Sequence, residues 1–294
     1  MAFSDTLARV LTAAVLIPIV LALVLWAPQA VYAAAVAVFA LLALREFLDL
    51  ADRSAMAPLR YVSYLAVLAL IAWLPAAGDV ARLSLLPKAP RIGLIAWPPA
   101  AGDVALLAAL LALALGMRSS RQLEKALPGA AATLLGIIYI GLPLALLAEL
   151  RRLPDGPQWV IYVLVITWVG DTAAYFAGRS FGRRRMSPRI SPGKTWEGAA
   201  ASLAAAVLFS LAYLTYFVPQ FPKAWSAAAA LAVNAAGQVG DLAESALKRG
   251  AGVKDSSTLL PGHGGLLDRM DALLFAVPAL WYIFSLRARF SAPL

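Results

Sequence analysis

Residues 127–149 read LPGAAATLLGIIYIGLPLALLAE, and only the last of them carries a charge. A helix needs about 20 consecutive, mainly apolar residues to cross the hydrocarbon core of a bilayer. The whole chain shares this character, with 62% hydrophobic and 14% charged residues, whereas soluble domains are about half apolar and a quarter charged. The sequence therefore predicts an all-α, polytopic integral membrane protein.

Apolar runs suited to crossing a membrane recur along the chain, and we interpret them as about nine transmembrane helices. The runs are 10–27, 30–44, 60–75, 104–117, 127–149, 158–178, 198–218, 224–240 and 271–286. We divide the chain into an N-terminal membrane region, 1–150, and a C-terminal catalytic region, 151–294. The C-terminal region holds four helices and two polar loops, 179–197 and 241–270.

The distribution of positive charge predicts the orientation in the membrane. Nine crossings place the N-terminus and the loops after even-numbered runs on one side, which then carries 17 of the 25 Lys and Arg residues. Positive loops stay in the cytoplasm, so we expect a multi-pass protein of the cytoplasmic (inner) membrane with its N-terminus and both polar loops inside. Arg9 before the first run also suits a secretory signal, but the apolar stretch continues to Trp26 and a second run follows, which favours a crossing. The net charge of +9 lies in short clusters, which favours contacts with membrane lipids over nucleic acid.

One internal repeat lies in the N-terminal region. Leu70–Ala81 reads LIAWLPAAGDVA and Leu94–Ala105 reads LIAWPPAAGDVA, with eleven of twelve positions identical. Solenoids show three or more copies, so two copies indicate a segmental duplication. We assign no chemistry to it.

Acidic side chains mark the ends of three apolar runs, and acids at membrane depth are expensive and usually functional. Asp171 lies near the end of the sixth run, Asp241 and Glu244 close the eighth, and Asp268 and Asp271 open the ninth. Each pair is three residues apart and shares a helical face. The pairs could converge on one hard cation. Structural ion pairs with neighbouring Lys and Arg residues, including Arg179 or Arg183 for Asp171, are the alternative.

The segment between these two acidic pairs favours the functional interpretation. It contains Asp255, several basic residues and the only histidine, His263, within PGHGG. Glycines let a backbone approach a ligand closely, although a lone histidine can be structural. Carboxylates with substrate phosphates suit Mg²⁺, and one histidine without any cysteine argues against zinc. These parts predict a metal-assisted phosphoryl or nucleotidyl transfer site.

A second polar cluster, SPGKTWEG at 191–198, precedes the seventh run. Its GKT triplet is not a Walker A motif, since Pro188 stands where that motif has glycine and no strand is expected before it. We expect a basic turn at a helix N-terminus, where Lys194, the Thr195 hydroxyl and free N–H groups could hold a phosphate. A helix cap with a lysine that sets topology is the alternative.

Taken together, these motifs resemble the phosphatidate cytidylyltransferases, also called CDP-diacylglycerol synthases. The stretch from Ser245 to Asp271 matches the signature of that family without departure across 27 positions. SPGKTWEG is similar to the family's SPKKTWEG element, with Gly193 where lysine is commoner, which removes one positive charge. DTAAYFAGRSFGRR at 171–184 is similar to a third element. The resemblance is strong over about 168–271 and rests on hydropathy upstream.

The resemblance implies a homodimeric enzyme that uses CTP, phosphatidate and Mg²⁺ and releases CDP-diacylglycerol and diphosphate. It also admits a second, monovalent cation such as K⁺. Asp241 and Asp268 occupy the metal-binding aspartate positions of the family.

From this resemblance and the charges we assign roles. Around the metal, cationic side chains would neutralise phosphate charge, namely Lys248, Arg249, Lys254 and Arg269. The nucleotide or lipid phosphate would contact Ser191, Lys194 and Thr195, with Ser245 also in substrate binding. Supporting or cation-coordinating roles fall to Asp171, Glu197, Asp255, His263 and Asp271.

Three rival functions remain. Another CTP-dependent lipid transferase or a lipid kinase would share most of these features, but the intact signature argues against both. An ion-coupled transporter predicts acids near the bilayer midplane and inverted repeats, and neither is seen in the sequence.

Overall fold

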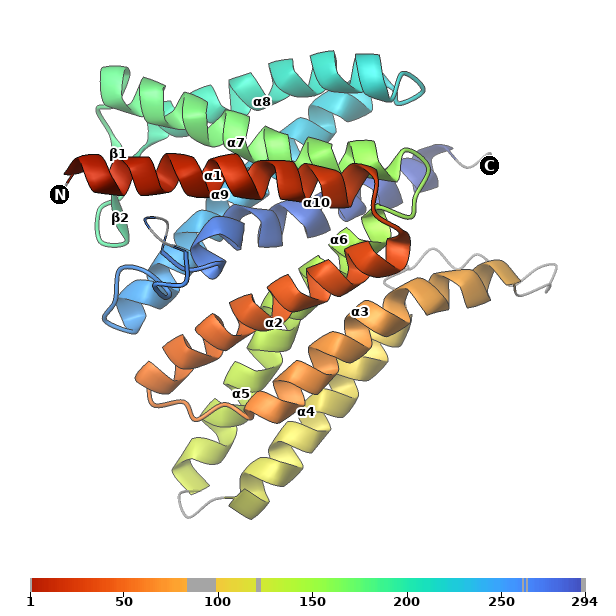
Figure 1. Cartoon of the computed structure of the whole chain (residues 1–294), viewed down its shortest axis with the longest axis vertical. Coiled ribbons are helices and arrows are strands. Elements are labelled where there is room, and N and C mark those ends of the chain that lie inside the picture. Colours follow the sequence, from red (N-terminus) through yellow and green to blue (C-terminus); the bar gives the residue numbers. More distant parts are fainter. Residues whose placement is uncertain (1, 84–98, 120–122, 261, 263, 292–294) are drawn as a thin grey trace. The chain divides into compact units, whose positions relative to one another are not determined.

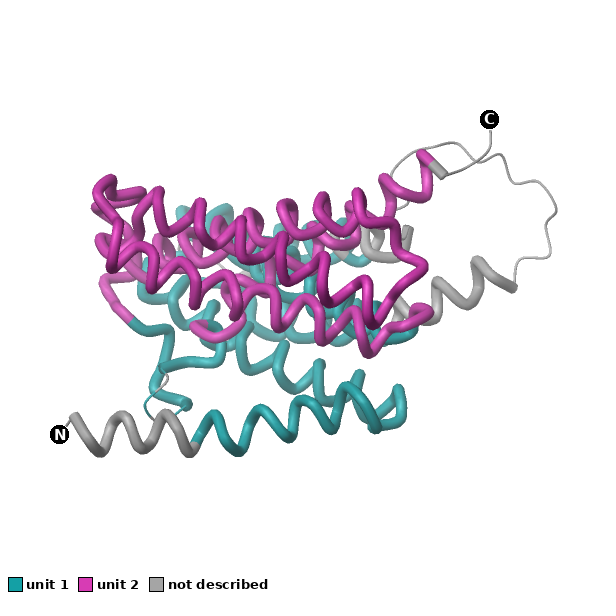
Figure 2. Tube along the Cα trace, turned by 90° about the horizontal axis from the view of Figure 1, so that it is seen from above, with its two compact units in different colours: residues 1–152, 255–267 teal, residues 153–254, 268–294 magenta. Residues whose placement is uncertain are grey.

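The computed structural model describes residues 2–83, 99–119, 123–260, 262 and 264–291. These residues form two compact units, which Figure 2 colours separately. Unit 1 comprises residues 1–152 and 255–267, and unit 2 comprises residues 153–254 and 268–294. The segment 255–267, which we assigned to the C-terminal region, therefore packs with the N-terminal helices.

Unit 1 is a bundle of helices in which α3 lies beside α4 (Figure 1). Its helices are α1 (Ala2–Leu25), α2 (Gln29–Arg53), α3 (Arg60–Leu83), α4 (Pro99–Ser119), η1 (Leu123–Lys125), α5 (Ala126–Gly136), η2 (Ile137–Gly141) and α6 (Leu142–Leu150). The last four run without a break and correspond to the predicted run 127–149. A single π-turn at η2 precedes Pro143, where a missing N–H disturbs the regular α-helical bonding.

Unit 2 contains four long helices and a short hairpin. Its elements are α7 (Gly156–Phe181), β1 (Arg185–Ser187), β2 (Ser191–Thr195), α8 (Trp196–Phe217), α9 (Lys223–Gly250) and α10 (Leu267–Ser291), whose first residue is grouped with unit 1. Helix α7 packs along α8, and α8 packs on α9 (Figure 1). A buried hydrogen bond of 2.9 Å between the Tyr162 hydroxyl and Ser210 Oγ joins α7 to α8.

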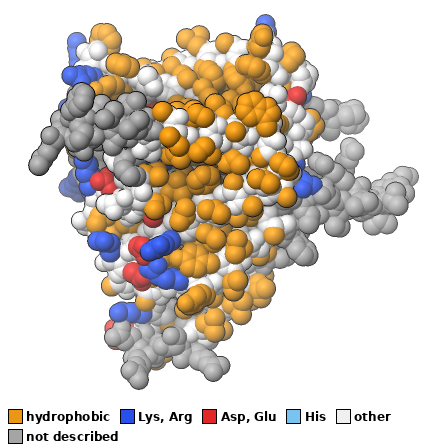
Figure 3. All heavy atoms as spheres, viewed as in Figure 1, with side chains coloured by type: hydrophobic (Ala, Val, Ile, Leu, Met, Phe, Trp, Pro, Cys, Tyr) orange, Lys and Arg blue, Asp and Glu red, His pale blue; other side chains and the backbone are white. Residues whose placement is uncertain are grey.

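The helices confirm the prediction of an all-α membrane protein. Among the described residues, five helical segments are long and apolar enough to cross a membrane: 29–53, 123–150, 156–181, 196–217 and 267–290. Hydrophobic side chains cover much of the face in Figure 3, and several large ones, such as Leu208 and Tyr216, are more than two-thirds exposed. A bilayer is the solvent in which such surfaces are stable. The count of nine crossings is not confirmed.

Two local expectations for unit 2 were wrong. No strand was expected before the GKT triplet, yet Arg185–Ser187 is a strand that pairs antiparallel with Ser191–Thr195. The eighth run was expected to end near residue 240, but α9 continues to Gly250 because LAESALKR contains mainly good helix formers. The helix ends where Gly252 adopts a positive φ of 72°, a conformation that glycine adopts readily.

The repeat lies only partly within the described residues. Its first copy, Leu70–Ala81, belongs to α3. In the second copy, residues 94–98 lie outside the described residues, and the remainder belongs to α4.

Candidate functional site

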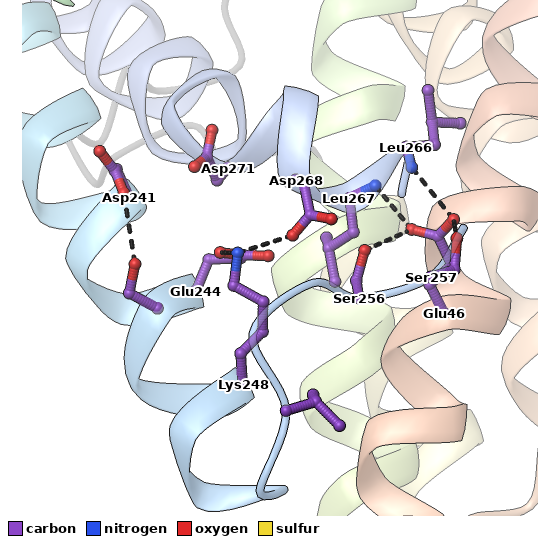
Figure 4. Close-up of polar contacts among 12 residues, drawn as sticks. Glu46, Asp241, Glu244, Lys248, Ser256, Ser257, Leu266, Leu267, Asp268 and Asp271 are labelled. Carbon is purple, nitrogen blue, oxygen red and sulfur yellow. Dashed lines mark hydrogen bonds and ion pairs between the residues drawn. The ribbon is translucent and has the colours of Figure 1, made fainter. Parts of the chain in front are cut away.

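The candidate site is built on the place where α9 and α10 cross. A Cβ atom on Gly240 would lie 2.5 Å from the backbone oxygen of Asp271, so only glycine permits this close approach. Asp241 follows Gly240 directly on α9, and Asp268 lies one helical turn before Asp271 on α10. The crossing thus brings the two acidic pairs predicted from sequence onto facing sides of two neighbouring helices (Figure 4).

Lys248 joins the two helices through a pair of buried carboxylates. Its Nζ lies 2.6 Å from Glu244 Oε2 and 2.6 Å from Asp268 Oδ1 (Figure 4). The side chains are 12%, 0% and 3% exposed respectively, so these charges are shielded from water and interact strongly.

The protonation of this trio reflects its burial. Burial raises the pKa of the Glu244 carboxyl to about 8, and Asp268 pushes it in the same direction while Lys248 opposes the shift. Burial alone would lower the pKa of Lys248, but its contacts with Asp268 and Glu244 raise it overall. Lys248 therefore stays cationic, and Glu244 takes up a proton far more readily than an exposed glutamate.

Asp241 has a different partner, which the sequence did not suggest. Lys194 on β2 places its Nζ 2.6 Å from Asp241 Oδ2, and Ser245 Oγ donates a longer bond of 3.4 Å to Asp241 Oδ1. The charges of Asp171 and Asp271 also interact with that of Asp241. Unit 2 thus gathers three aspartates and the GKT lysine into one electrostatic cluster.

The hairpin that carries Lys194 is held by its own polar contacts. Thr195 Oγ1 accepts a bond of 3.1 Å from the Gly198 N–H, which is an N-cap for α8. The Glu197 carboxylate accepts bonds of 3.1–3.3 Å from the N–H groups of Arg183 and Arg184. The capping alternative therefore describes Thr195 well, and Glu197 fixes the path of the basic loop.

The other predicted residues are less tightly held. Arg249 donates to the Val253 carbonyl, and Arg269 is exposed on α10, where its charge interacts with Asp171. Arg179, one candidate partner of Asp171, donates instead to the Tyr175 hydroxyl.

Ser191 begins β2 and is half-buried, while Lys254 is exposed at the end of the unit 2 segment. Asp255 is exposed and belongs to unit 1, and His263 lies outside the described residues.

Sequence reasoning missed Glu46, which is buried in unit 1. Its carboxylate accepts four hydrogen bonds from the 255–267 segment (Figure 4). The second run was expected to end at residue 44, which left Glu46 in a loop, whereas α2 continues to Arg53. The available signal was an acid inside the largely apolar stretch FALLALREFLDLA at 39–51.

The carboxylates of unit 2 are of the chemical type that a hard divalent cation binds. Asp241 and Asp268 offer carboxylate oxygens, the ligands that Mg²⁺ prefers. In the described part of the chain, no group of three or more acidic or histidine side chains is arranged to hold a metal ion. A cation here would complete its coordination with water and phosphate oxygens, which is the usual habit of Mg²⁺.

The chain is similar in sequence to proteins that are already known. The model of the cytidylyltransferase family matches residues 7–287. The phosphatidate cytidylyltransferase of Bacillus subtilis is 40% identical over 153 residues, which are 52% of this chain and 57% of the relative. The enzymes so named from Haemophilus influenzae and Brucella suis are 41% identical over 129 residues and 44% identical over 151 residues. These two matches cover 42% and 51% of this chain, and 45% and 55% of the relatives.

The chain spans about half the length of the curated relatives that it matches. The family model, in contrast, covers nearly the whole sequence, including both acidic pairs and the GKT hairpin. The chain therefore belongs to the cytidylyltransferase family.

Proposed function

We propose that this protein is a phosphatidate cytidylyltransferase, which joins CTP and phosphatidate to give CDP-diacylglycerol and diphosphate. Two observations together support the proposal. The family model matches residues 7–287, and carboxylates and lysines lie close together where α9 and α10 cross. Relatives about 40% identical bear this name. The apolar helices suit an enzyme whose lipid substrate lies in the membrane.

The reaction needs little acid–base chemistry from the protein. The second pKa of a phosphomonoester is about 6, so the phosphatidate phosphate is already a competent nucleophile at neutral pH. Its oxygen attacks the α-phosphorus of CTP, the bond to the β-phosphate breaks, and diphosphate leaves with the electron pair. Catalysis then consists of positioning and neutralisation of negative charge.

The residues of unit 2 are suited to that task. Lys194 and Lys248 already stand beside carboxylates at 2.6 Å and would reach phosphate oxygens by small movements of their flexible side chains. Arg249, Lys254 and Arg269 would add charge around the departing diphosphate. Ser191 and the hairpin backbone would hold a phosphate of the nucleotide or lipid.

Asp241 and Asp268 would hold Mg²⁺, with a monovalent cation such as K⁺ as a second ion. A divalent ion bound there would neutralise negative charge on the CTP phosphates. In that state Lys194 would leave Asp241 and Lys248 would leave Asp268, and each lysine would contact phosphate instead. Lys248 would keep Glu244 as its buried partner. We further propose that the site faces the cytoplasm at the inner membrane and that the protein works as a homodimer.

In the direct test, the purified protein is placed in vesicles that contain phosphatidate and is incubated with CTP labelled on the cytidine. We expect labelled CDP-diacylglycerol and an equal amount of diphosphate, both dependent on Mg²⁺. Replacing phosphatidate with diacylglycerol or a polyprenol distinguishes a lipid kinase, which would transfer the γ-phosphate and release CDP. Absence of product with every lipid would contradict the proposal and leave a transporter as the rival.

A further inference from the structure

A buried glutamate outside the proposed site contacts the segment that carries the family signature. Glu46 lies on α2 and is only 4% exposed. Its Oε1 accepts bonds from Ser257 Oγ at 2.6 Å and the Leu266 N–H at 3.0 Å. Its Oε2 accepts bonds from Ser256 Oγ at 2.9 Å and the Leu267 N–H at 2.8 Å. All these groups belong to unit 1.

Hydrogen bonds satisfy both oxygens of the Glu46 carboxylate. A buried charge is tolerated when hydrogen bonds satisfy its lone pairs, and here two hydroxyls and two backbone N–H groups do so. The two serines and two leucines stand at opposite ends of the segment 256–267. Glu46 therefore closes that segment into a loop anchored on α2 at both ends.

One signature glycine is explained by the same contact. A Cβ on Gly265 would lie 2.5 Å from Glu46 Oε2 and closer still to Ser256 Oγ. An added Cβ would therefore push the Glu46 carboxylate or the Ser256 hydroxyl out of its present position. A glycine of the PGHGG sequence thus serves to let the loop approach Glu46.

The anchor also fixes the start of α10. Leu267 is the first residue of that helix, its N–H would otherwise lack a partner within the helix, and a carboxylate is the favoured partner at a helix N-terminus. Asp268, the proposed metal ligand, follows Leu267 directly in the chain. A defined direction for the first turn of α10 therefore depends on an acid 221 residues away in sequence.

We propose that Glu46 is a positioning residue, which holds the two ends of the signature segment, 256–257 and 266–267, and so sets the first turn of α10 for the transfer reaction. Its effect on catalysis rests on the proposed function, whereas its effect on the loop does not. Glutamine has the same shape but one N–H₂ group in place of an oxygen. Whichever way the amide is turned, it faces either the Leu266 or the Leu267 N–H, which cannot accept a hydrogen bond.

The experiment compares the wild-type chain with Glu46→Gln and with Asp49→Asn. The control changes an acid on the same helix whose side chain is 45% exposed and which pairs with Arg60 at 2.6 Å. Asp52 also pairs with Arg60, so the control leaves that cation with a partner. Hydrogen–deuterium exchange is measured on peptides covering 256–267, and turnover and the Mg²⁺ concentration for half-maximal activity are measured per folded molecule.

We expect faster exchange in Glu46→Gln, confined to these peptides and the start of α10. We also expect activity or apparent Mg²⁺ affinity to fall by about 10- to 100-fold, as for residues that orient metal ligands. Asp49→Asn should match the wild type in both. Gly265→Ala should reproduce the Glu46→Gln behaviour, because it crowds the same carboxylate from the loop side.

Wild-type exchange in Glu46→Gln would overturn the anchoring of the loop. Faster exchange with unchanged turnover and Mg²⁺ dependence would overturn its role in the reaction. Should the wild type itself lack transferase activity, the proposed function fails, and the exchange measurement still decides the anchoring.

Discussion

Lys248 is the residue on which the buried charges of unit 2 depend. It neutralises Asp268 and contacts the Glu244 carboxyl, and these two side chains are 3% and 0% exposed. Removing one member of a buried ionic group leaves its partner unpaired and costs about 3–5 kcal/mol. We therefore predict that Lys248→Met lowers the free energy of unfolding by about that amount, seen as a lower thermal unfolding midpoint in detergent.

The matched control for Lys248→Met is Lys223→Met, an exposed lysine at the start of the same helix. It should unfold like the wild type. Adding Glu244→Gln to Lys248→Met should recover part of the loss, because one unpaired carboxylate is removed. Equal midpoints for Lys248→Met and the wild type would contradict the buried trio.

Gly193 is the position at which the SPGKTWEG element departs from the commoner lysine. A Cβ placed there meets nothing within 4 Å, so a larger side chain fits without strain. We predict that Gly193→Lys lowers the KM for CTP or phosphatidate by up to a few-fold, because an exposed charge pair contributes about 0.2–1 kcal/mol. The gain should shrink at high salt. Gly193→Ala should leave KM unchanged, and a Gly193→Lys variant with the KM of Gly193→Ala would show that phosphate does not approach β2.

At the scale of elements, the crossing of α9 and α10 brings the acidic pairs together. The two helices are so close that a Cβ on Gly240 would lie 2.5 Å from the backbone oxygen of Asp271. Both atoms are held rigidly by helix backbones, so neither can move aside as a flexible side chain would. We predict that Gly240→Val costs about 1–3 kcal/mol or more of stability and abolishes turnover. Circular dichroism melts and the vesicle assay measure the two effects.

Gly250→Ala is the control for Gly240→Val, since it lies on the same helix and its added Cβ meets nothing within 4 Å. This variant should retain wild-type stability and turnover. An active, stable Gly240→Val chain would mean that α9 and α10 need not approach this closely for function.

At the scale of the molecule, hydropathy predicts much of the fold because a bilayer imposes one simple pattern on every crossing. Each predicted run coincides with a helix or part of one. Helix ends are harder to predict: α9 extends ten residues past Gly240 through polar residues, since helix formation there depends on propensity and packing and not on hydropathy.

The candidate site was predictable only in part for a similar reason. Motif spacing identified Asp241, Lys248 and Asp268, whose chemistry is visible in one stretch of sequence. The pairing of Lys194 with Asp241 and the anchoring by Glu46 join residues 47 and about 210–221 positions apart. Such contacts are set by the tertiary packing of helices, and no local pattern in a single sequence contains them.

The predicted orientation can be tested on the whole molecule because the chain has no cysteine. Single cysteines at Ser54 and Pro154, both exposed, would lie on opposite sides of the membrane if the positive-inside distribution holds. We predict that a membrane-impermeant maleimide labels Pro154→Cys in intact cells but labels Ser54→Cys only after lysis. The reverse pattern would place the N-terminus outside.

The central claim is that the carboxylates of α9 and α10 support transfer of a cytidine nucleotide to a lipid phosphate. The most direct measurement is Mg²⁺-dependent formation of CDP-diacylglycerol in phosphatidate vesicles by Asp241→Asn and Asp268→Asn. The control, Asp155→Asn, changes an aspartate at the start of α7 that contacts Gln220. We predict that the two site variants remain folded, because Lys248 still has Glu244 as a partner in Asp268→Asn, but lose on the order of 10²-fold or more in turnover, while the control stays active. Near-wild-type turnover by either folded site variant would contradict the account.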